Sequence, residues 1–438
     1  MRPDGPHLPH PDPQSLDRME DMGTAVVGGG YAGLAAAVSL AENGVPVTLF
    51  ESSRTLGGRA RGLICNGERL DNGQHILLGC YAETLALIEK TCGAAEPFSR
   101  IRLDLSIDAF RLKSLPLPPP LDLLAGMLLS QGLSFQEKAS AIRFISRTRR
   151  ARQDADIAVA ELLRQNRQSE KLVRLLWKPL CISALNTPIE AASSLTFQAV
   201  LKDGLDGAGS DIIIPKVDLS TLFPLGAANH VRDRGGEILT STPVRAIRKK
   251  TRGFEIITDA SSRSFSHVVA AVAPQHLSRL IAELPEIKGT GHFAYQPIYT
   301  TYSRYPDAIS LPRPMMGFSR GLSQWLFDRG TWCGQKGLIA AVTSSEGEHL
   351  TLSHDAIAKK VHEEIGRIVP GLPLPLWQKV IAEKRATFSC TPNLERPAQK
   401  TAVPGFHLAG DYTVGKYPAT LEAAVRSGLS CARLIVSS

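Results

Sequence analysis

The chain of 438 residues exceeds the roughly 250–300 residues at which a single hydrophobic core stops growing, so we expect two domains. With 43% hydrophobic and 21% charged residues, its composition excludes a disordered or fibrous protein. The net charge of +8 at pH 7 would suit nucleic acid, anionic lipid or an anionic cofactor, and does not choose among them.

The first 22 residues are rich in Pro, His and Asp and contain no apolar run. They therefore cannot form the apolar core of a secretion signal, and we expect a disordered tail over residues 1–22. The seven cysteines show neither a C-x-x-C pair nor the spacing of metal ligands. This pattern predicts reduced thiols and no bound metal.

Residues 24–50 are predicted to form a strand, a glycine turn, a helix and a second strand. The runs 24–27 and 45–50 are short and apolar, and the run 31–42 is alanine-rich. The turn has the pattern G-x-G-x-x-G, whose glycines bend the chain, admit a pyrophosphate and allow close helix packing at a helix N-terminus with free N–H groups. Its candidate cofactor contacts are Gly28, Gly29, Gly30, Ala32 and Gly33.

Glu51 ends the second predicted strand. At this position of a dinucleotide-binding unit, an acidic side chain hydrogen-bonds the ribose of an unphosphorylated adenosine. The glycine pattern alone is weak evidence, but the pattern and Glu51 together predict a dinucleotide cofactor. The alternative is a glycine-rich turn beside a surface glutamate.

The segment Leu56-Gly57-Gly58-Arg59 follows at once. Its pairing with Glu51 resembles the flavin amine oxidase superfamily, and the resemblance implies that Gly57, Gly58 and Arg59 lie against the pyrophosphate of FAD. The chemistry agrees, because Gly58 permits close approach of the backbone and a guanidinium can bind a diphosphate through two hydrogen bonds. A solvated arginine is the alternative.

The next segment, 71–81, reads DNGQHILLGCY. It occupies the position of the superfamily segment that passes the isoalloxazine ring of the flavin. The resemblance therefore implies that Gly73, Gln74 and His75 contact the cofactor.

Residues 115–135 combine many leucines with prolines, and a predicted helix over 135–153 follows. The prolines and Asp122 interrupt any continuous span of about 20 apolar residues, which rules against a transmembrane helix. The leucines and Met127 could instead insert shallowly into a membrane surface, with anionic head groups bound by the arginines of the helix. These arginines are Arg143, Arg147, Arg149, Arg150 and Arg152. In the alternative interpretation, the leucines line an internal tunnel and the arginines are solvated.

In the middle of the chain, 218–229 resembles a helix, 241–257 reads as two strands around a basic turn, and 267–272 is an apolar strand. Val244 lies where relatives have the strand whose backbone meets the adenine. We expect irregular structure over 284–314.

Near the end of the chain, a predicted strand over 406–409 runs into Gly410 and Asp411, and a helix is expected over 419–435. In relatives, the carboxylate of this Gly-Asp pair binds the ribityl or pyrophosphate region, and the last helix points its N-terminus at the flavin ring. The resemblance adds five candidate contacts: Gly410, Asp411, Ala419, Thr420 and Leu421.

Because the two ends of one FAD site lie far apart in the sequence, we expect an α/β fold with a discontinuous Rossmann-type FAD-binding domain. An α+β substrate-binding domain of mixed sheet and helices, part of it facing a membrane, would be inserted within it. The expected FAD-binding segments are 23–80, 216–273 and 401–438. The expected substrate-binding segments are 81–215 and 274–400. Since no tethering cysteine or histidine is recognisable, FAD should be bound non-covalently.

Three strings together resemble the squalene-associated FAD-dependent desaturases, a group understood as hydroxysqualene dehydroxylases of bacterial hopanoid and squalene synthesis. They are 71–81, EKRATF at 383–388 and the Pro-Ala-Thr-x-Glu run at 418–422. The resemblance covers nearly the whole chain after Met22. It departs at Tyr412, where the group has tryptophan, and at Lys416-Tyr417, where the group is less polar.

The resemblance implies that reduced FAD delivers a hydride to hydroxysqualene as the hydroxyl group leaves as water, which gives squalene. Such a reaction needs an apolar tunnel, exclusion of water and a proton donor beside the leaving oxygen. His75 and Tyr417 are the candidate donors. A histidine near a flavin is as often a structural hydrogen-bonding group.

Three other functions stay open. A carotenoid-type desaturase would use the same tunnel in the opposite redox direction. An amine oxidase is less expected, because there is no aromatic pair just before Gly410 and no cysteine in the context of a covalent flavin. A non-catalytic, FAD-bearing scaffold for a squalene-pathway synthase would bind flavin without turnover.

We expect the protein to lie on the cytoplasmic face of the membrane without spanning it, since an isoprenoid substrate partitions into lipid. Other squalene-pathway enzymes are possible partners. Nucleic acid is not expected, because the clustered arginines lack interleaved aromatic residues. Only one dinucleotide pattern is present, since 204–209 follows no strand, so the sequence does not identify the electron donor to the flavin.

Overall fold

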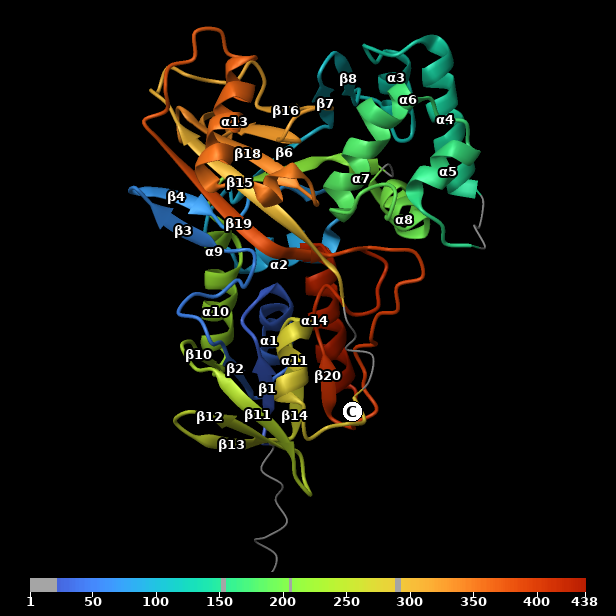
Figure 1. The fold of residues 1–438 in the computed structure, drawn as a ribbon. Helices are drawn as coiled ribbons and strands as arrows, with labels where there is room; N and C mark the ends of the chain where they lie inside the picture. Colours follow the sequence, from blue (N-terminus) through green and yellow to red (C-terminus); the bar gives the residue numbers. More distant parts are fainter. Residues whose placement is uncertain (1–21, 151–154, 205–206, 288–292) are drawn as a thin grey trace, which may run out of the picture.

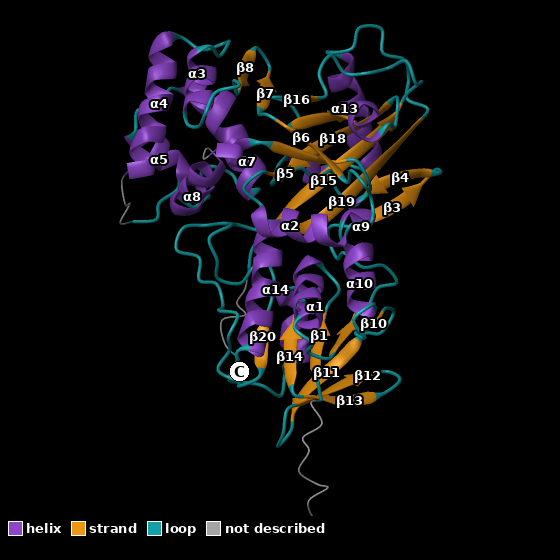
Figure 2. Ribbon diagram, turned by 180° about the vertical axis from the view of Figure 1, so that it is seen from behind, coloured by secondary structure: helices purple, strands orange, loops and turns teal. Residues whose placement is uncertain are grey.

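The computed structural model describes residues 22–150, 155–204, 207–287 and 293–438 (Figure 1). A smaller part with a parallel sheet lies at one end, and a larger part with a mostly antiparallel sheet and a group of helices lies at the other (Figures 1 and 2). Apart from Met22, the tail expected over 1–22 lies outside the described residues.

The smaller part is built on a five-stranded sheet in the order β10-β2-β1-β14-β20, with every neighbouring pair parallel. Its strands are β1 (Thr24–Val27), β2 (Val47–Phe50), β10 (Glu237–Leu239), β14 (His267–Ala270) and β20 (Phe406–Leu408). Three separate regions of the chain thus contribute to one sheet. Because β1 and β2 are buried on both faces, they read as continuous apolar runs in the sequence.

Alternate residues of this sheet enter different cores. Val26 and Val269 pack with the helices α1 (Tyr31–Glu42), α10 (Pro224–Arg232) and α14 (Leu421–Val436). Ala25 and Ala270 pack on the other face. That face is covered by α11 (Pro274–Leu280) and a small sheet of β11 (Val244–Lys249), β12 (Phe254–Thr258) and β13 (Ser262–Phe265). A parallel sheet covered on both faces confirms the expected α/β class.

The larger part contains a seven-stranded sheet in the order β19-β15-β18-β17-β16-β7-β8. Its strands, in chain order, are β7 (Asp104–Ile107), β8 (Phe110–Lys113), β15 (Tyr295–Arg304), β16 (Met315–Gly317), β17 (Trp325–Asp328), β18 (Leu338–Ser344) and β19 (Trp377–Phe388). Among the described strands of this sheet, β16 and β7 alone pair in parallel. The helix α12 (Arg329–Cys333), the short 3-10 helix η4 (Glu348–Thr351) and the helix α13 (His354–Gly366) lie between these strands in the sequence.

The expectation of irregular structure over 284–314 is wrong, because this region contains the ten-residue strand β15, which pairs with β19 on one side and β18 on the other. Pro297 interrupts the strand pattern in the sequence, and proline lacks the N–H that a central strand needs. The structure accommodates it at a β-bulge between Gln296 and Ile298, where the register with β19 shifts.

A group of helices packs beside the large sheet around Phe144 and Trp177, whose rings lie 4.9 Å apart in an edge-to-face arrangement. The group comprises α3 (Leu121–Leu128), α4 (Phe135–Arg150), α5 (Val159–Gln165), α6 (Glu170–Leu172), η2 (Val173–Trp177), α7 (Lys178–Leu185), α8 (Ser194–Gly204) and η3 (Gly207–Ser210). The predicted end of α4 at Gln153 lies outside the described residues.

Met127 is buried against Leu112 and its neighbours, so the expectation that it inserts into a membrane is wrong. It lies on the face of α3 that packs on the protein, which the sequence pattern did not distinguish from the leucine face. Among the described helices, none is long and apolar enough to cross a membrane.

Short elements join the two parts of the molecule. They are the hairpin of β3 (Gly62–Cys65) and β4 (Glu68–Asp71), the sheet of β5 (Leu77–Leu78), β9 (Ile212–Pro215) and β6 (Phe98–Ile101), and the helices α2 (Ala82–Thr91) and α9 (Leu219–Leu222). The expected domain boundaries at residues 80 and 215 both fall at the β5-β9-β6 sheet, and the division into domains stays a prediction.

Candidate functional site

Glu51 holds the glycine turn that precedes α1. The amide of Gly29 donates a hydrogen bond to Oε2 of Glu51 at 2.7 Å, and the amide of Ser53 donates to Oε1 at 2.7 Å. The expected adenine strand begins nearby, because the amide of Thr242 donates to the carbonyl oxygen of Glu51 at 2.8 Å and Val244 starts β11. This hydrogen bond brings the chain two residues before Val244 to the backbone of Glu51.

The N-terminus of α1 fits an anion. Gly30 precedes the helix without a side-chain capping hydrogen bond, and Tyr31 and Ala32 in the first turn are buried. A buried and uncapped helix start needs a polar partner for its N–H groups. Among the described residues other than its two chain neighbours, none has a heavy atom within 4 Å of the position a Cβ would take on Gly30, so the turn faces open space there.

The Leu-Gly-Gly-Arg segment lies directly against this turn. The amide of Gly57 donates to the carbonyl oxygen of Gly29 at 2.8 Å. A Cβ on Gly58 would lie 3.3 Å from the Cα of Gly30, and the φ of Gly58 is +60°. Gly58 therefore serves both a left-handed backbone and a close approach to the glycine turn.

Arg59 connects the two ends of the chain. Its Nη2 donates to Oδ1 of Asp411 at 2.6 Å, and its Nη1 donates to the carbonyl oxygen of Ala386 in β19 at 2.7 Å. Burial lowers the pKa of Arg59, but Asp411, Glu383 and Tyr295 together raise it by more, so the guanidinium stays charged. The structure thus brings together Arg59 and Asp411, which the sequence predicted to meet at one cofactor, and adds a contact with β19 that was not predicted.

Gly410 and the start of α14 complete this edge of the site. The amide of Gly410 donates to Oγ of Ser427 at 2.8 Å, and Oγ1 of Thr420 caps α14 by accepting from the amide of Ala423 at 3.1 Å. Ala419 and Leu421 flank this capping residue. The first turn of α14 also holds Glu422, a fully buried carboxylate that accepts hydrogen bonds from the amide and hydroxyl of Thr84 in α2.

His75 lies next to Gly73 and Gln74 in the segment after β4. Its Nδ1 lies 2.7 Å from the carbonyl oxygen of Gly73, and because a carbonyl only accepts, Nδ1 carries the proton. Burial lowers the pKa of His75 by more than the Gly73 hydrogen bond and Asp71 raise it. At neutral pH the ring is therefore neutral, with Nε2 as a hydrogen-bond acceptor.

Tyr417 is also buried, and its hydroxyl donates to the carbonyl oxygen of Cys80 at 3.3 Å. Its ring makes an edge-to-face contact with Tyr81, with 6.1 Å between ring centres, and the guanidinium of Arg426 lies 5.2 Å above it. Burial raises the pKa of Tyr417 well above its ordinary value, so the hydroxyl stays protonated. His75 and Tyr417 both stay predictions as proton donors.

Sequence reasoning missed Arg329, which orients the segment that carries His75. This buried side chain donates from Nη1 to Oδ2 of Asp71 at 3.2 Å and to Oε1 of Gln74 at 2.8 Å. Oδ1 of Asp71 in turn accepts from the amide of Leu219 at 2.8 Å. No motif surrounds Arg329, and a sequence pattern cannot distinguish a buried arginine from an exposed one.

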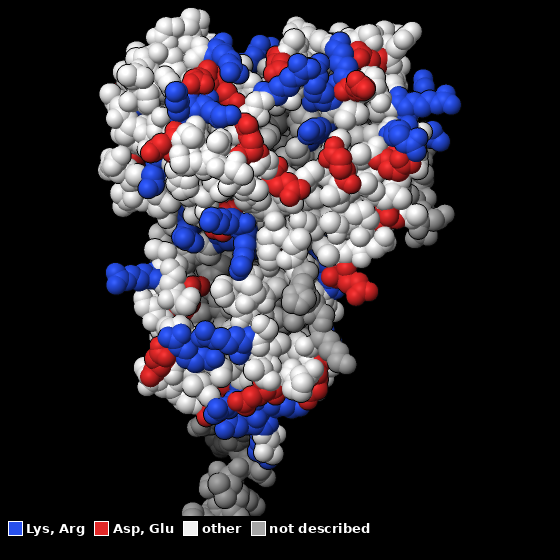
Figure 3. All heavy atoms as spheres, viewed as in Figure 1, with Lys and Arg blue, Asp and Glu red and all other residues white. Residues whose placement is uncertain are grey.

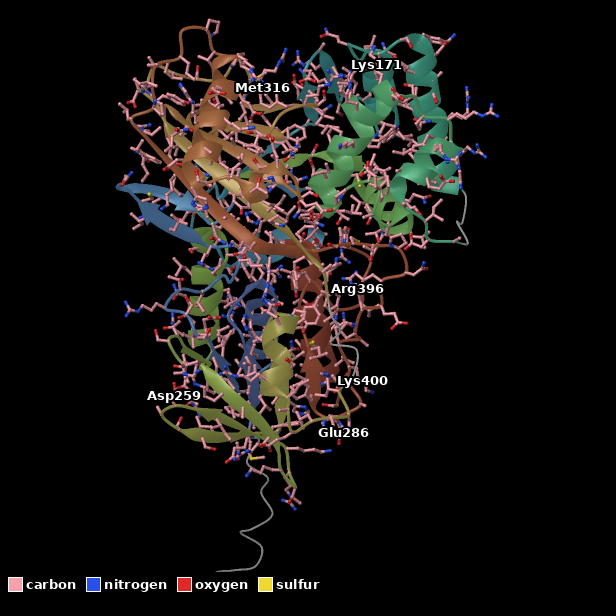
Figure 4. The ribbon with its side chains drawn as sticks, viewed as in Figure 1. Lys171, Asp259, Glu286, Met316, Arg396 and Lys400 are labelled. Carbon is pink, nitrogen blue, oxygen red and sulfur yellow. The ribbon has the colours of Figure 1, made fainter. Side chains whose placement is uncertain are left out.

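Arg396 is a second residue that sequence reasoning missed. Figure 4 shows it beside α14, just below the junction of the two parts of the molecule. Its guanidinium donates to the carbonyl oxygens of residues 411, 412, 415 and 417, at 2.7, 3.3, 3.2 and 3.0 Å. It thus fixes the loop that carries Asp411 and Tyr417.

Comparison with known proteins agrees with this arrangement. The pattern of the family described as flavin containing amine oxidoreductase matches residues 31–436. The hydroxysqualene dehydroxylase of Zymomonas mobilis is 27% identical over 439 residues, which cover 94% of this chain and 99% of that protein. A probable zeta-carotene desaturase of Synechococcus elongatus is 23% identical, with 95% and 99% covered.

Solved structures show the same fold. An oxidoreductase from Methanosarcina mazei has a TM-score of 0.74 at 17% identity, covering 93% of this chain and 99% of that chain. A putrescine oxidase bound to putrescine has a TM-score of 0.71 at 16% identity, covering 95% and 99%.

Proposed function

The chain belongs to the family of flavin-containing amine oxidoreductases, and on that premise we propose that it binds FAD non-covalently and reduces hydroxysqualene to squalene. It is a flavin-dependent oxidoreductase. The observation that carries the proposal is the contact of Arg59 with both Ala386 and Asp411. It joins the superfamily segments at Arg59 and Asp411 to the string 383–388, which is one of the three that resemble hydroxysqualene dehydroxylases, and relatives of that name match nearly the whole chain.

FAD fits the residues that line the glycine turn. In the proposal the pyrophosphate lies at the N-terminus of α1, between Gly30 and Gly58, where a charged Arg59 is close by. Glu51 reaches the ribose and the backbone near Val244 faces the adenine. Gly410, Asp411 and the start of α14 face the isoalloxazine end, together with Gly73, Gln74 and His75.

The reaction exchanges a C–O bond of the substrate for a C–H bond. The flavin, when bound and reduced, supplies the hydride with its two electrons. The hydroxyl group leaves with one proton as water. Overall, one alcohol is reduced to one hydrocarbon while one flavin is oxidised. The protein must exclude water from the cation formed at the carbon, and the partly buried ring of Tyr81 and the buried ring of Tyr417 suit that task.

Carotenoid-type desaturation is the second candidate, because desaturases are also similar to this chain over nearly its full length. The two reactions need the flavin in opposite redox states. Oxidised protein should leave phytoene unchanged, and protein reduced with dithionite should convert hydroxysqualene. Conversion of phytoene by the oxidised protein would instead favour desaturation. Bound flavin without turnover of either substrate would support the scaffold alternative.

We also propose that the protein docks on the cytoplasmic membrane surface through α3 and its flanks. Leu121, Leu124 and Leu128 follow helical spacing on one exposed face of α3, and such a continuous apolar face is typical of interfacial helices. We define the α3 surface as Leu117, Leu121, Leu124, Leu128, Leu129 and Phe135, all exposed. The side chains of Arg149, Arg150 and Arg152 lie outside the described residues, and Arg143 and Arg147 are the described arginines of the basic helix.

A further inference from the structure

A second leucine and proline segment, 372–377, precedes β19 and reads Leu-Pro-Leu-Pro-Leu-Trp. Leu374 is 79% exposed and Leu376 is 66% exposed. Among the described residues, the five most exposed large hydrophobic side chains are Leu374, Ile64, Phe135, Leu129 and Leu376. Four of these five therefore lie in this segment or on the α3 surface.

The two leucine-rich segments lie at the same end of the molecule. The views from front and back both place α3 and α13 at the end farthest from the five-stranded sheet (Figures 1 and 2). The other end of β19 reaches the junction, where Ala386 accepts a hydrogen bond from Arg59. At about 3.3 Å per residue, Trp377 at the start of the strand lies roughly 30 Å beyond that contact.

The chemistry around segment 372–377 suits an anionic lipid surface. A cavity of about 610 Å³ between α13 and β19 is lined by Leu374 and by four basic or imidazole side chains. These are His354, Lys359, His362 and Lys379, against the single acidic residue Asp355. In Figure 3, Lys and Arg side chains lie across this end of the molecule, with Asp and Glu side chains among them.

The backbone of this segment is also suited to an apolar environment. Proline has no N–H to leave unpaired, and the amides of Leu372 and Leu376 donate to the carbonyl oxygens of Val369 and Arg304 at 3.3 and 2.7 Å. Unpaired backbone N–H groups are what makes an irregular segment unfavourable in lipid. Exposed leucines on a largely satisfied backbone can therefore enter the head-group region.

We propose that segment 372–377 is a second membrane anchor, which with the cavity of Lys359 and Lys379 binds anionic lipid while the α3 surface inserts at the other side of the same end of the molecule. The choice of a membrane as the partner rests on the proposed function, because a lipid-soluble isoprenoid substrate is what brings the protein to a bilayer. Two anchors far apart in the sequence would fix the orientation of the molecule on the membrane, which one helix cannot do.

Flotation of the full-length, FAD-loaded protein with vesicles tests this proposal. Wild type should float with vesicles that contain phosphatidylglycerol, and the double variant Leu374→Ser/Leu376→Ser should partition about tenfold less. Lys359→Glu/Lys379→Glu should also float about tenfold less at low salt, and the difference from wild type should shrink at high salt. Flavin content equal to that of wild type shows that the variants are folded.

Two matched controls separate anchoring from general surface effects. Ile64→Ser removes an equally exposed apolar side chain from the β3-β4 hairpin, and Lys249→Glu/Arg252→Glu reverses two exposed charges on the smaller part. Both should float like wild type. The proposal is overturned if the leucine double variant floats like wild type. If that variant also loses a concentration-dependent dimer, the leucines form a contact between two copies of the chain instead.

Turnover in detergent micelles distinguishes this proposal from the proposed function. Neither leucine lies at the flavin site, so the double variant should convert hydroxysqualene in micelles at the wild-type rate. If no form of the protein converts hydroxysqualene but the leucine variant still fails to float, the proposed substrate is wrong and the membrane anchor stands.

Discussion

Arg59 is the side chain on which the candidate site most depends. It contacts residues more than 300 positions away, both in β19 and in the Gly-Asp pair after β20. Asp411 helps to raise the pKa of Arg59, and in the proposed function the same guanidinium would also bind the pyrophosphate.

Replacement of Arg59 by glutamine should therefore weaken FAD binding. Loss of hydrogen bonds to charged groups amounts to about 1.5–3 kcal/mol, or roughly 10- to 150-fold in affinity. Titration of the apoprotein with FAD, followed by quenching of flavin fluorescence, measures this change. Arg385→Gln, which changes an exposed arginine of β19, the strand that Arg59 contacts, serves as the control. Equal affinities of the two variants would remove Arg59 from the site.

The pH dependence of turnover distinguishes the two candidate proton donors. If protonated His75 is the donor, the rate should fall as pH rises through a pKa below its ordinary value of 6.5, because burial lowers that pKa. If Tyr417 is the donor, the rate should be flat across neutral pH, because its raised pKa keeps the hydroxyl protonated. Single-turnover rates of wild type, His75→Gln and Tyr417→Phe, measured between pH 5 and 8, distinguish these cases. A fall in rate with rising pH that persists in both variants would exclude both residues.

At the scale of elements, the helices α1 and α14 are held together by a close contact of backbones. A Cβ on Gly428 of α14 would lie 2.1 Å from the carbonyl oxygen of Ala32 in α1. This contact couples the last helix of the chain to the glycine turn at the first helix, and so it positions both ends of the candidate cofactor site.

Gly428→Ala should destabilise the protein and loosen FAD. Insertion of a methyl group into a packed contact typically lowers the free energy of unfolding by about 1–3 kcal/mol. Urea unfolding of the flavin-free protein measures this change in the free energy of unfolding. The matched control is Gly366→Ala in α13, where no heavy atom lies within 4 Å of the added Cβ, and no loss of stability is expected there. A Gly428→Ala protein as stable as the control would contradict the packing described here.

The sequence predicted those elements whose burial and local pattern agree. Strands β1 and β2 are apolar because both faces of their sheet are covered, and Gly28 is needed at φ +112°. The strand-turn-helix-strand unit over 24–50 could therefore be predicted from the sequence. By contrast, β15 was missed because Pro297 disguises a central strand that tolerates it through a bulge. Arg329 and Arg396 were missed because their roles depend on carbonyl and carboxylate partners supplied by distant segments.

At the scale of the whole molecule, the five-stranded sheet brings together strands from the start, middle and end of the chain. The expectation that the first and last motifs form one site follows from this topology, since β1 and β20 both flank β14. The large sheet then carries β19 from the proposed membrane end down to Arg59. One strand thus spans the distance between the proposed lipid contact and the proposed flavin site.

The central claim, that this flavin-dependent oxidoreductase reduces hydroxysqualene, is tested most directly by an anaerobic single turnover. Protein loaded with FAD and reduced with dithionite in heavy water would be mixed with hydroxysqualene, with flavin absorbance and lipid mass spectra recorded together. The proposal predicts one squalene for each flavin reoxidised, carrying one deuterium from the exchanged hydride position. Flavin that stays reduced while hydroxysqualene is recovered unchanged would contradict it.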